Sequence, residues 1–416
     1  MTSSELSLSN HSSLVSESDS NDSLDLTHDI IDNYNVITLL GKGSYSKVWL
    51  VYNINDMKYY ALKVMNAGDY NEGKEELMIM KQISSDEKYI NKLKHYFIET
   101  RFVDDNTKKF LCLVYDLCCG NLDGLSRKGI YKDGYPIHMA KSFLKQTLDA
   151  LYSVHYRLNG FHGDIKPDNI LLCGLNNRDM KYINQYNKHT FNDTYSKIKK
   201  DYCAEKKIKK LDTGTKHRIR KKVHCAIMVT MGENNESPFH CNEEYFINPH
   251  VKLTDFGFFC KNTEKYDKPF GTRYYMAPEI ILMGECDEKV DIWALGCMLY
   301  ELVTGEILFD PHSSKRGSTD FHHLEMIICM CGEFNKSYIE RTKYYKQFFK
   351  NGRLKDIIYS DDYNIPLFDK INKRLKDNRI EDDTLCKLIA SMLNLTPSKR
   401  PSIKELLKDE WLIVKN

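Results

Sequence analysis

The fold of this chain is decided by the stretch His162-Gly163-Asp164-Ile165-Lys166-Pro167-Asp168-Asn169. It sets a lysine two residues after a carboxylate and an amide five residues after it. This ordered set suits phosphoryl transfer, because Asp164 can accept the hydrogen bond of a substrate hydroxyl, Lys166 can neutralise charge on the moving phosphoryl group, and Asn169 can ligate Mg²⁺. A polar loop without function would rarely carry these residues in this order.

A glycine-rich segment lies upstream. Its glycines permit a tight strand–loop–strand turn whose backbone N–H groups can approach phosphates closely. Alone the pattern is weak, since an ordinary hairpin gives the same letters; no helix pattern follows it, which argues against a dinucleotide-binding fold. The candidate ATP-binding residues in this segment are Leu40, Gly41, Lys42, Gly43, Ser44, Tyr45, Ser46, Lys47 and Val48.

Two further motifs supply a cation and a metal ligand. Lys63 ends a strand in Ala61-Leu62-Lys63 and can place its charge on a phosphate, but it needs a carboxylate to hold it. Glu76 on the next predicted helix is the candidate, because Glu75 lies about 100° round the helix. Asp255 in Asp255-Phe256-Gly257 is a hard oxygen ligand for a second metal position.

With Gly271-Thr272-Arg273-Tyr274-Tyr275-Met276-Ala277-Pro278-Glu279, these motifs resemble the signature set of protein kinases. The resemblance runs from Tyr34 to about Trp411. It implies an α+β, two-lobed kinase fold: a small antiparallel β-sheet N-lobe with one helix (34–117), and a larger, mainly helical C-lobe (118–413). It also implies an ATP-dependent transferase that uses ATP and Mg²⁺.

The same resemblance implies individual roles. Val48, Ala61 and Leu171 should sandwich adenine, beside a gatekeeper at Tyr115 and a hinge at Asp116 and Leu117. Lys166 with Thr272 is the serine/threonine-type pattern. Two structural pairings are also implied: Asp291 should anchor the catalytic loop, and Glu279 should pair with Arg400.

A narrower resemblance is to the SR-protein kinase family. Gly163 stands where most kinases have arginine, about 70 residues are inserted between Asn169 and Asp255, and the chain carries the run Leu308-Phe309-Asp310-Pro311-His312-Ser313. Membership would imply Arg/Ser-rich protein substrates and activity without activation-loop phosphorylation. Ala277-Pro278-Glu279 departs from the family's Ser-Leu-Glu.

The family's docking groove uses acidic residues in the C-lobe. Glu306 matches one of them, and Asp310, Asp320 and Glu325 lie near in sequence, but two aligned positions are His322 and Cys329. With Thr272, Glu306 and Asp310 are the candidate substrate-contacting residues.

Composition bounds what else the chain can be. It has 416 residues with 60 Lys+Arg against 58 Asp+Glu, so net charge gives no case for a membrane or for nucleic acid unless a local patch supplies one. Thirteen cysteines without a CxxC pair, and an N-terminus lacking an apolar core, indicate an intracellular protein of a reducing compartment, cytoplasmic and/or nuclear. We expect a monomer.

Two segments stand apart from the kinase pattern. Residues 1–33 are predicted to be a disordered, Ser-rich acidic tail; 1–27 contain ten serines, five acids and no Lys or Arg. Residues 174–248 form a basic insert within the C-lobe, centred on Lys197–Lys222. A solvated, disordered insert is the default expectation, and removing it should change catalysis only a few-fold. A localisation signal or nucleic-acid patch is the alternative.

Hydrophobic periodicity predicts the remaining elements. The predicted strands are Asn35–Leu40, Lys47–Asn53, Lys58–Val64 and Phe110–Leu117, and the predicted helices are Glu75–Ile83, Ile137–Tyr156, Lys289–Thr304, Phe321–Cys331, Asp382–Leu393 and Ser402–Trp411.

Overall fold

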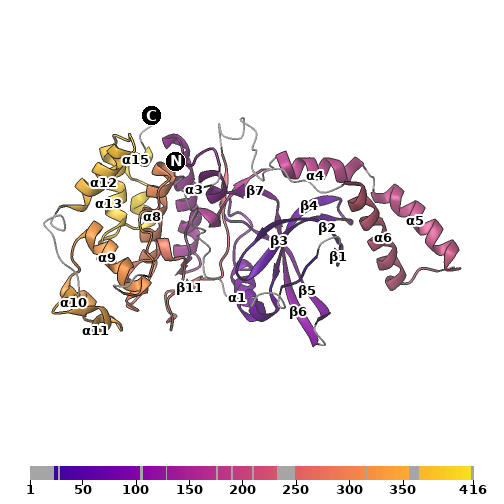
Figure 1. Cartoon of the computed structure of the whole chain (residues 1–416), viewed down its shortest axis with the longest axis horizontal. Helices are drawn as coiled ribbons and strands as arrows, with labels where there is room; N and C mark the ends of the chain where they lie inside the picture. The colour runs from indigo at the N-terminus through magenta and orange to yellow at the C-terminus, as the bar shows by residue number, and fades with distance from the viewer. Residues whose placement is uncertain are drawn as a thin grey trace, which may run out of the picture.

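The computed structural model describes residues 23–26, 29–103, 106–127, 129–174, 177–188, 191–208, 210–231, 249–313, 317–355 and 365–413. They form two unlike lobes, a sheet-rich N-lobe and a helical C-lobe, with a helical extension beyond the N-lobe (Figure 1). The expected α+β kinase architecture is therefore present. In the part of the chain so described, no helix is long and apolar enough to cross a membrane.

The N-lobe is one antiparallel six-stranded sheet in the order β1-β2-β3-β4-β6-β5. Apolar residues alternate along its strands, so each strand can bury one face. Helix α1 (Tyr70–Met80) packs Leu77 and Met80 into the core. The strands are β1 (Ile30–Ile31), β2 (Tyr34–Lys42), β3 (Ser46–Asn53), β4 (Lys58–Met65), β5 (Leu93–Val103) and β6 (Asn106–Asp116).

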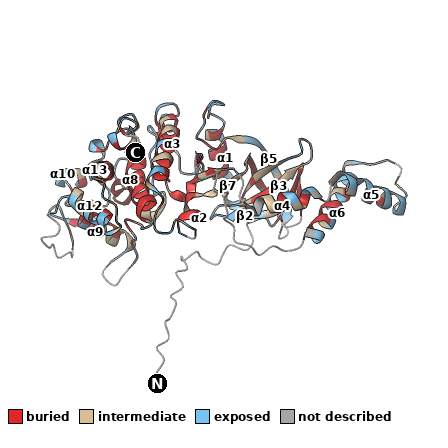
Figure 2. Ribbon diagram, turned by 90° about the horizontal axis from the view of Figure 1, so that it is seen from above, coloured by how far each residue is buried: buried red, intermediate tan, exposed pale blue. Residues whose placement is uncertain are grey.

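The C-lobe is built around α8 (Lys289–Thr304), a helix buried on all sides (Figure 2). A helix that is apolar all round has no face to offer water, so its neighbours surround it. The other C-lobe helices are α2 (Leu122–Ser126), α3 (Ile137–Tyr156), α7 (Pro278–Ile281), α9 (Thr319–Cys331), α10 (Lys336–Ile339), α11 (Tyr345–Phe348), α12 (Leu367–Asp377), α13 (Asp383–Met392), α14 (Ile403–Leu406) and α15 (Glu410–Ile413).

Short pairs of strands fix the positions of the loops that lie at the boundary between the two lobes. β9 (Ile170–Cys173) pairs with β7 (Cys118–Asn121) on one side and β10 (Val251–Leu253) on the other. β8 (Gly160–Phe161) pairs with β11 (Cys260–Lys261). These pairings bring the segments containing Asp164 and Asp255 to one place, although 91 positions separate them in sequence. A further two-stranded pair joins β12 (Phe349–Lys350) and β13 (Arg353–Leu354).

The ordered chain starts before the expected boundary at residue 34. Strand β1 pairs Ile30 with Asn35 of β2, and Leu26 is fully buried in the sheet's core. Two adjacent β-branched residues, Ile30 and Ile31, are enough to add a short edge strand, and the acidic composition of the segment concealed it. Residues 1–22, where the rest of the predicted tail lies, are outside the described residues.

The insert differs most from expectation. Its described part forms three helices, α4 (Asn177–Lys188), α5 (Phe191–Glu205) and α6 (Thr213–Met231). Helices α4 and α6 bury Tyr186, Ile219 and Val223 against Leu50 of the sheet. The expectation of a solvated insert is therefore wrong for these helices: their apolar residues are paired with a sheet face, so the insert leaves the C-lobe and packs on the N-lobe.

Polar contacts add to this packing. The side-chain amide of Asn35 donates to the Tyr186 hydroxyl at 3.0 Å, and the Tyr59 hydroxyl donates to Oδ1 of Asn187 at 2.6 Å. Tyr52 packs against the Tyr186 ring. Hydrogen bonds to side chains 128 and 151 residues away fix the register of α4 on the sheet.

Other boundaries differ more modestly. Helix α1 starts five residues before the predicted start at Glu75, β5 was not predicted, and the predicted helix Ser402–Trp411 is two short helices, α14 and α15. Strand β5 is an edge strand with Tyr96, Ile98 and Phe102 exposed, which weakens the apolar alternation that identifies a strand.

Candidate active site

A cleft of about 610 Å³ lies where the sheet meets the C-lobe loops. The glycine-rich turn between β2 and β3 covers it, β4 forms its roof, and β9 with the loop after β8 forms its floor. The predicted site residues that line it are Leu40, Gly41, Lys42, Gly43, Ser44, Tyr45, Ser46, Val48, Ala61, Lys63, Asp116, Asp164, Lys166, Asn169, Leu171, Asp255 and Thr272.

Lys63 is held at the centre of the cleft by two carboxylates. Its Nζ lies 2.9 Å from both oxygens of Glu76 and 3.0 Å from Oδ1 of Asp255. Glu75, one position earlier, is exposed, so the expected choice between the two glutamates is confirmed. Glu76 of helix α1 thus fixes the position of Lys63 of strand β4, so that the lysine ammonium group lies in the cleft.

The charges of this trio stabilise one another. Burial by itself would lower the pKa of Lys63, but Glu76 and Asp255 outweigh it and raise that pKa above its usual value. Lys63 in turn lowers the pKa of Asp255. Asp255 has a φ of 65°, a left-handed conformation that costs an aspartate about 1–3 kcal/mol. Paying that strain aims an ionised carboxylate into the cleft.

Asp164 is the meeting point of three polar side chains. Its Oδ1 accepts a hydrogen bond from Thr272 Oγ1 at 2.7 Å, and its Oδ2 lies 2.8 Å from Lys166 Nζ and 3.0 Å from Asn169 Nδ2. Lys166 also donates to Thr272 at 2.7 Å. Because Asn169 uses its NH₂ group here, its carbonyl oxygen remains available as a ligand.

The loop carrying Asp164 is anchored from below by α8. Asp291, fully buried, accepts the backbone N–H groups of His162 at 2.8 Å and Gly163 at 2.9 Å. His155 Nε2 lies 2.8 Å from its Oδ2. Burial would raise the pKa of Asp291, but the hydrogen bond from His155 and the charges around it bring that pKa below its usual value. The expected anchor contact is thus present.

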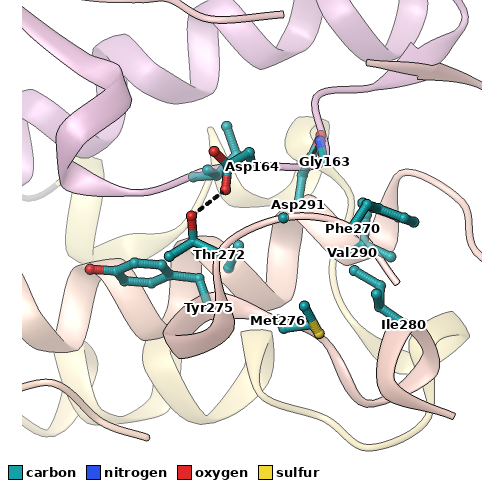
Figure 3. A pocket seen from close by; sticks show the side chains of 12 residues that line it. Gly163, Asp164, Phe270, Thr272, Tyr275, Met276, Ile280, Val290 and Asp291 are labelled. Carbon is teal, nitrogen blue, oxygen red and sulfur yellow. Dashed lines mark hydrogen bonds between the residues drawn. The ribbon is translucent and has the colours of Figure 1, made fainter. Parts of the chain in front are cut away.

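Gly163 and Gly271 bring the catalytic loop and the following segment into backbone contact. Figure 3 shows Gly163 of this loop with Phe270 and Thr272 of the segment. Both glycines have φ near +80°, and a Cβ on Gly271 would lie 2.5 Å from the Gly163 carbonyl oxygen. A Cβ on Gly163 would lie 2.7 Å from the carbonyl oxygen of Phe258. Since only glycine fits both positions without movement, the absence of arginine at 163 has a steric reason.

The segment between Asp255 and Thr272 is held by contacts on both sides. Phe270 stacks on Phe161 with ring centroids 5.8 Å apart, and β11 pairs with β8. The Tyr266 hydroxyl donates to the Gly284 carbonyl. Phe256 packs its ring on His162. These contacts tie the segment to the catalytic loop on one side and to the residues after α7 on the other.

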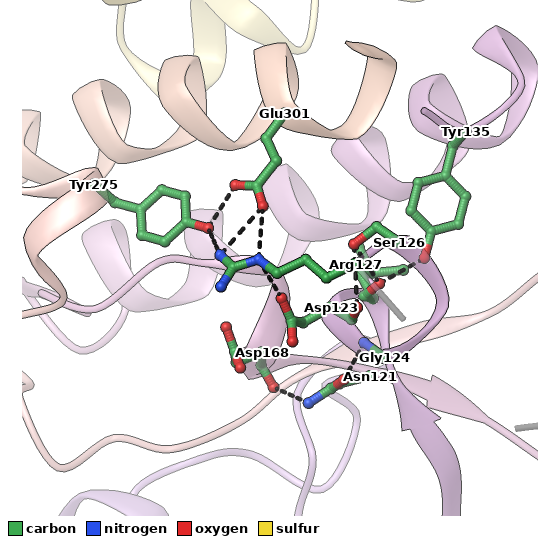
Figure 4. A network of polar contacts seen from close by, with 10 residues as sticks. Asn121, Asp123, Gly124, Ser126, Arg127, Tyr135, Asp168, Tyr275 and Glu301 are labelled. Carbon is green, nitrogen blue, oxygen red and sulfur yellow. Dashed lines mark hydrogen bonds and ion pairs between the residues drawn. The ribbon is translucent and has the colours of Figure 1, made fainter. Parts of the chain in front are cut away.

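The end of that segment is tied to α2 and α8 by a polar network (Figure 4). Arg127 contacts Glu301 at 3.3 Å, Tyr275 at 3.1 Å and Asp123 at 2.8 Å. The Tyr275 hydroxyl donates to the buried Glu301, and burial raises the pKa of both groups. The network fixes the three residues that follow Thr272.

The donor set of the cleft fits Mg²⁺ with ATP. Asp255 and the Asn169 carbonyl are hard oxygen ligands of the kind that Mg²⁺ takes, and Mg²⁺ commonly completes its shell with phosphate oxygens and water. The Asp255 side chain is 44% exposed in the cleft, so an oxygen is accessible. When bound, the metal would neutralise phosphate charge; Lys63 would position the phosphates.

Three predicted ATP-binding residues lie outside the cleft lining. Glu76 contacts Lys63, which lines the cleft, and Lys47 is not among the lining residues. Leu117 packs with the insert's apolar core. Sequence reasoning missed other lining residues: Asn91, Cys118, Gly120, Asn121, Asp168, Thr254, Phe258 and Gly271. Of these, Asp168 and Gly271 stand inside motifs already quoted and could have been found there.

The predicted substrate residues outside the cleft are exposed. Glu306 and Asp310 follow α8, and Glu306 accepts a hydrogen bond from Tyr300. Asp320 forms an ion pair with Arg273, so its carboxylate is already occupied and is a poorer candidate for binding a substrate arginine. The expected Glu279–Arg400 pair is present and fully buried, with 2.9 Å between Nη2 and Oε2.

A second groove, of about 730 Å³, lies between α9 and α12. His322, Cys329 and Glu325 all line it, so the three residues flagged from sequence do share a surface. Its opposite wall carries three basic residues and one acid, which give it mixed charge. They are Lys370, Lys373, Arg374 and Asp377.

Fold and cleft together define a phosphotransferase of the protein kinase type, and the family model described as "Protein kinase domain" matches residues 34–217 and 241–412. The chain belongs to the protein kinase family. The Lys166–Thr272 pair and the relatives described next agree on its class: it is an ATP-dependent protein serine/threonine kinase.

The chain is similar to named kinases over most of its length. It is 27% identical to the serine/threonine-protein kinase SRPK of Physarum polycephalum, with 91% of this chain and 86% of the relative covered. It is 23% identical to the protein kinase dsk1 of Schizosaccharomyces pombe (91% and 80%) and 21% identical to SRSF protein kinase 3 of Sus scrofa (91% and 86%).

Proposed function

We propose that this kinase phosphorylates serines in Arg/Ser-rich proteins and needs no phosphorylation of its own activation segment. The observation that carries the proposal is the Asp164–Lys166–Thr272 cluster, closed by the Gly163–Gly271 contact. In many kinases a phosphate ordering that segment pairs with an arginine before the catalytic aspartate. In this chain the close contact between Gly163 and Gly271 takes the place of that phosphate–arginine pair.

Each residue then has a role. Asp164 accepts the hydrogen bond of the substrate hydroxyl, and Lys166 neutralises charge on the transferred group. Asn169 and Asp255 hold Mg²⁺, and Lys63 positions the ATP phosphates. Val48, Ala61 and Leu171, which line the cleft, sandwich adenine.

The Arg/Ser preference is supported by the names of two relatives and by the exposed Glu306 and Asp310. Carboxylates can bind guanidinium groups in a bidentate manner. Because the α9–α12 groove has mixed charge, docking of arginines would depend on these two acids. The low cysteine density without a CxxC pair supports a cytoplasmic or nuclear location, and no disulfide bond joins cysteines within the described ranges.

One experiment tests the substrate. We would measure kcat/KM for an Arg-Ser octamer and a Lys-Ser octamer with wild type and with Glu306→Gln/Asp310→Asn. The proposal expects the Arg-Ser peptide to be favoured, and the double substitution to reduce that preference. Equal efficiency on both peptides, unaffected by the substitutions, would refute the Arg/Ser assignment.

A second experiment tests regulation. Phosphatase treatment of the purified kinase should change its rate less than twofold, because Thr263 and Tyr266 are the segment's acceptors from 258 to 270 and neither is needed as a phosphate. A loss above tenfold that an upstream kinase restores would contradict this part of the proposal.

A further inference from the structure

The hairpin of α5 and α6 (191–231) carries a dense positive surface at the far end of the molecule from the C-lobe (Figure 1). We call it the basic hairpin. Lys197–Lys222 contains twelve basic and three acidic residues. Those on the described, exposed surface include Lys197, Lys199, Lys200, Lys216, Arg218, Lys221 and Lys222.

The N-terminal segment joins the ordered chain beside this hairpin. Asp29 contacts Lys221 Nζ at 3.0 Å and Arg101 at 3.2 Å, and β1 lies against α6. Leu26 is buried under the sheet. Asp29 and β1 therefore lie at the sheet edge beside α6, while Leu24 and Leu26 pack on the sheet face opposite to the insert.

Arg220 gives an independent sign that an anion belongs here. Its Nε and Nη2 are buried, and no residue in the described ranges accepts a hydrogen bond from either. A buried donor left unpaired costs about 1–3 kcal/mol, and more when charged. The charge that acts on Arg220 is that of Asp32, which follows β1, so Arg220 faces the region where the N-terminal strand meets α6.

The segment itself has the complementary chemistry. Residues 1–22 contain four acids and nine serines and no Lys or Arg. Three of the acids, Glu17, Asp19 and Asp22, fall in the last six residues before the structure begins. Phosphate on Ser16, Ser18 or Ser20 would add about −1.5 to −2 charges each.

We propose that the basic hairpin binds the acidic N-terminal segment of the same chain, through Ser16–Asp22. Leu26 lies one turn before Asp29 and is fixed on the sheet, and the seven residues from Ser16 to Ser23 span at most about 23–25 Å when extended. The exposed face of α6 from Lys221 back to Gly214 is only about 10 Å long. The segment can therefore reach His217 and Arg218, which share the face of Lys221 at helical spacing.

Tethering is the reason to prefer this occupant over nucleic acid. A short flexible connection gives an effective concentration in the millimolar range, so even weak charge pairing is populated. Free RNA would have to displace the segment, and would do so most readily at low salt. RNA binding is the competing outcome of the test.

The test uses zero-length carbodiimide cross-linking of the full chain, which joins carboxylates to lysines, followed by mass spectrometry. We expect cross-links from Glu17 or Asp19 to Lys216 or Lys222, decreasing as salt increases. Arg218→Glu should reduce their yield at least fivefold, and leaves the reporting lysines in place. Arg341→Glu, the same exchange at an exposed C-lobe position, should leave the yield unchanged.

Two results would overturn the proposal. One is a yield that Arg218→Glu and Arg341→Glu affect equally. The other is an absence of these cross-links at low salt while Arg218→Glu weakens binding of a labelled single-stranded RNA, which would make the hairpin a nucleic-acid surface instead.

Discussion

One face of the N-lobe sheet serves two regions of the molecule. One end of this face lines the ATP cleft with polar groups nearby, and the other end is covered by apolar residues of the insert. At one end Val48 and Ala61 line the ATP cleft. At the other end Leu50 and Tyr59, two residues further along the same strands, pack against helices of the insert. Side chains two apart on a strand share a face, so cleft and insert are neighbours on one surface.

The two ends are also joined. Leu40 lines the cleft and contacts the insert's apolar core, and Leu117 of the hinge packs there too. The insert is thus a structural part of the kinase domain. Deleting residues 176–246 would uncover Ile37 and Leu50, so we now expect deletion to destabilise the N-lobe and to change catalysis by more than the few-fold effect predicted from the sequence.

The largest change in rate should come from a substitution in the ATP cleft, the polar end of the sheet face. Asp255→Asn removes the charge that contacts Lys63 and that can bind metal, so we expect a rate loss of about 10²–10³ or more, the scale of losing one preorganised electrostatic group. Thermal unfolding should change little, since the cleft is solvent-lined. Near-wild-type turnover under saturating Mg²⁺ would eliminate the metal-ligand role.

The next prediction makes the same exchange in both regions. Gly271→Ala places a Cβ 2.5 Å from the Gly163 carbonyl and should lower kcat about tenfold or more. Gly214→Ala on α6 meets nothing closer than 3.6 Å and should stabilise that helix by up to about 1 kcal/mol. Initial rates and melting curves measure the two. An active Gly271→Ala enzyme would show that the glycine contact is dispensable.

The apolar end is tested by two valines of α6. Val223 is fully buried against the sheet, whereas Val229 is 76% exposed. Val223→Ala should cost about 2 kcal/mol through lost burial and a residual cavity. Val229→Ala should stay within about 0.5 kcal/mol. Denaturant unfolding and hydrogen exchange of 177–231 report the difference; equal costs would mean that the insert is not docked.

The smallest effect concerns a single polar contact. Tyr59→Phe removes the hydrogen bond to Asn187 and should cost about 1 kcal/mol, the usual net worth of such a bond. A double-mutant cycle with Asn187→Ala isolates the pair. A coupling energy near zero would remove this bond from the account of docking.

The contrast explains how far the sequence could predict the structure. The chemistry proposed for Lys63, Asp164, Asn169 and Asp255 restricts each position to one or two residue types, so short motifs in a fixed order pointed to them. Even a pair across 121 residues, Glu279 with Arg400, could be named, because the resemblance to protein kinases implied it.

The docking of the insert has no such signature. The docking residues could be replaced by other apolar residues of similar size, so no sequence motif identifies them. They are Tyr186, Ile219 and Val223. The basic residues between them indicated solvation, although on a helix they occupy only the outer face. Which sheet such a helix covers depends on partners about 150 residues away, and a periodic pattern does not contain that information.

The central claim is that Asp164 serves a phosphoryl-transfer site that is assembled without activation. Its most direct test is transfer of labelled γ-phosphate from ATP to a serine peptide by phosphatase-treated protein, comparing wild type, Asp164→Asn and the exposed control Asp369→Asn. We predict robust transfer by wild type and Asp369→Asn and a loss of about 10² or more in Asp164→Asn. Transfer by Asp164→Asn at the wild-type rate, or no transfer by any of the three proteins, would contradict the account.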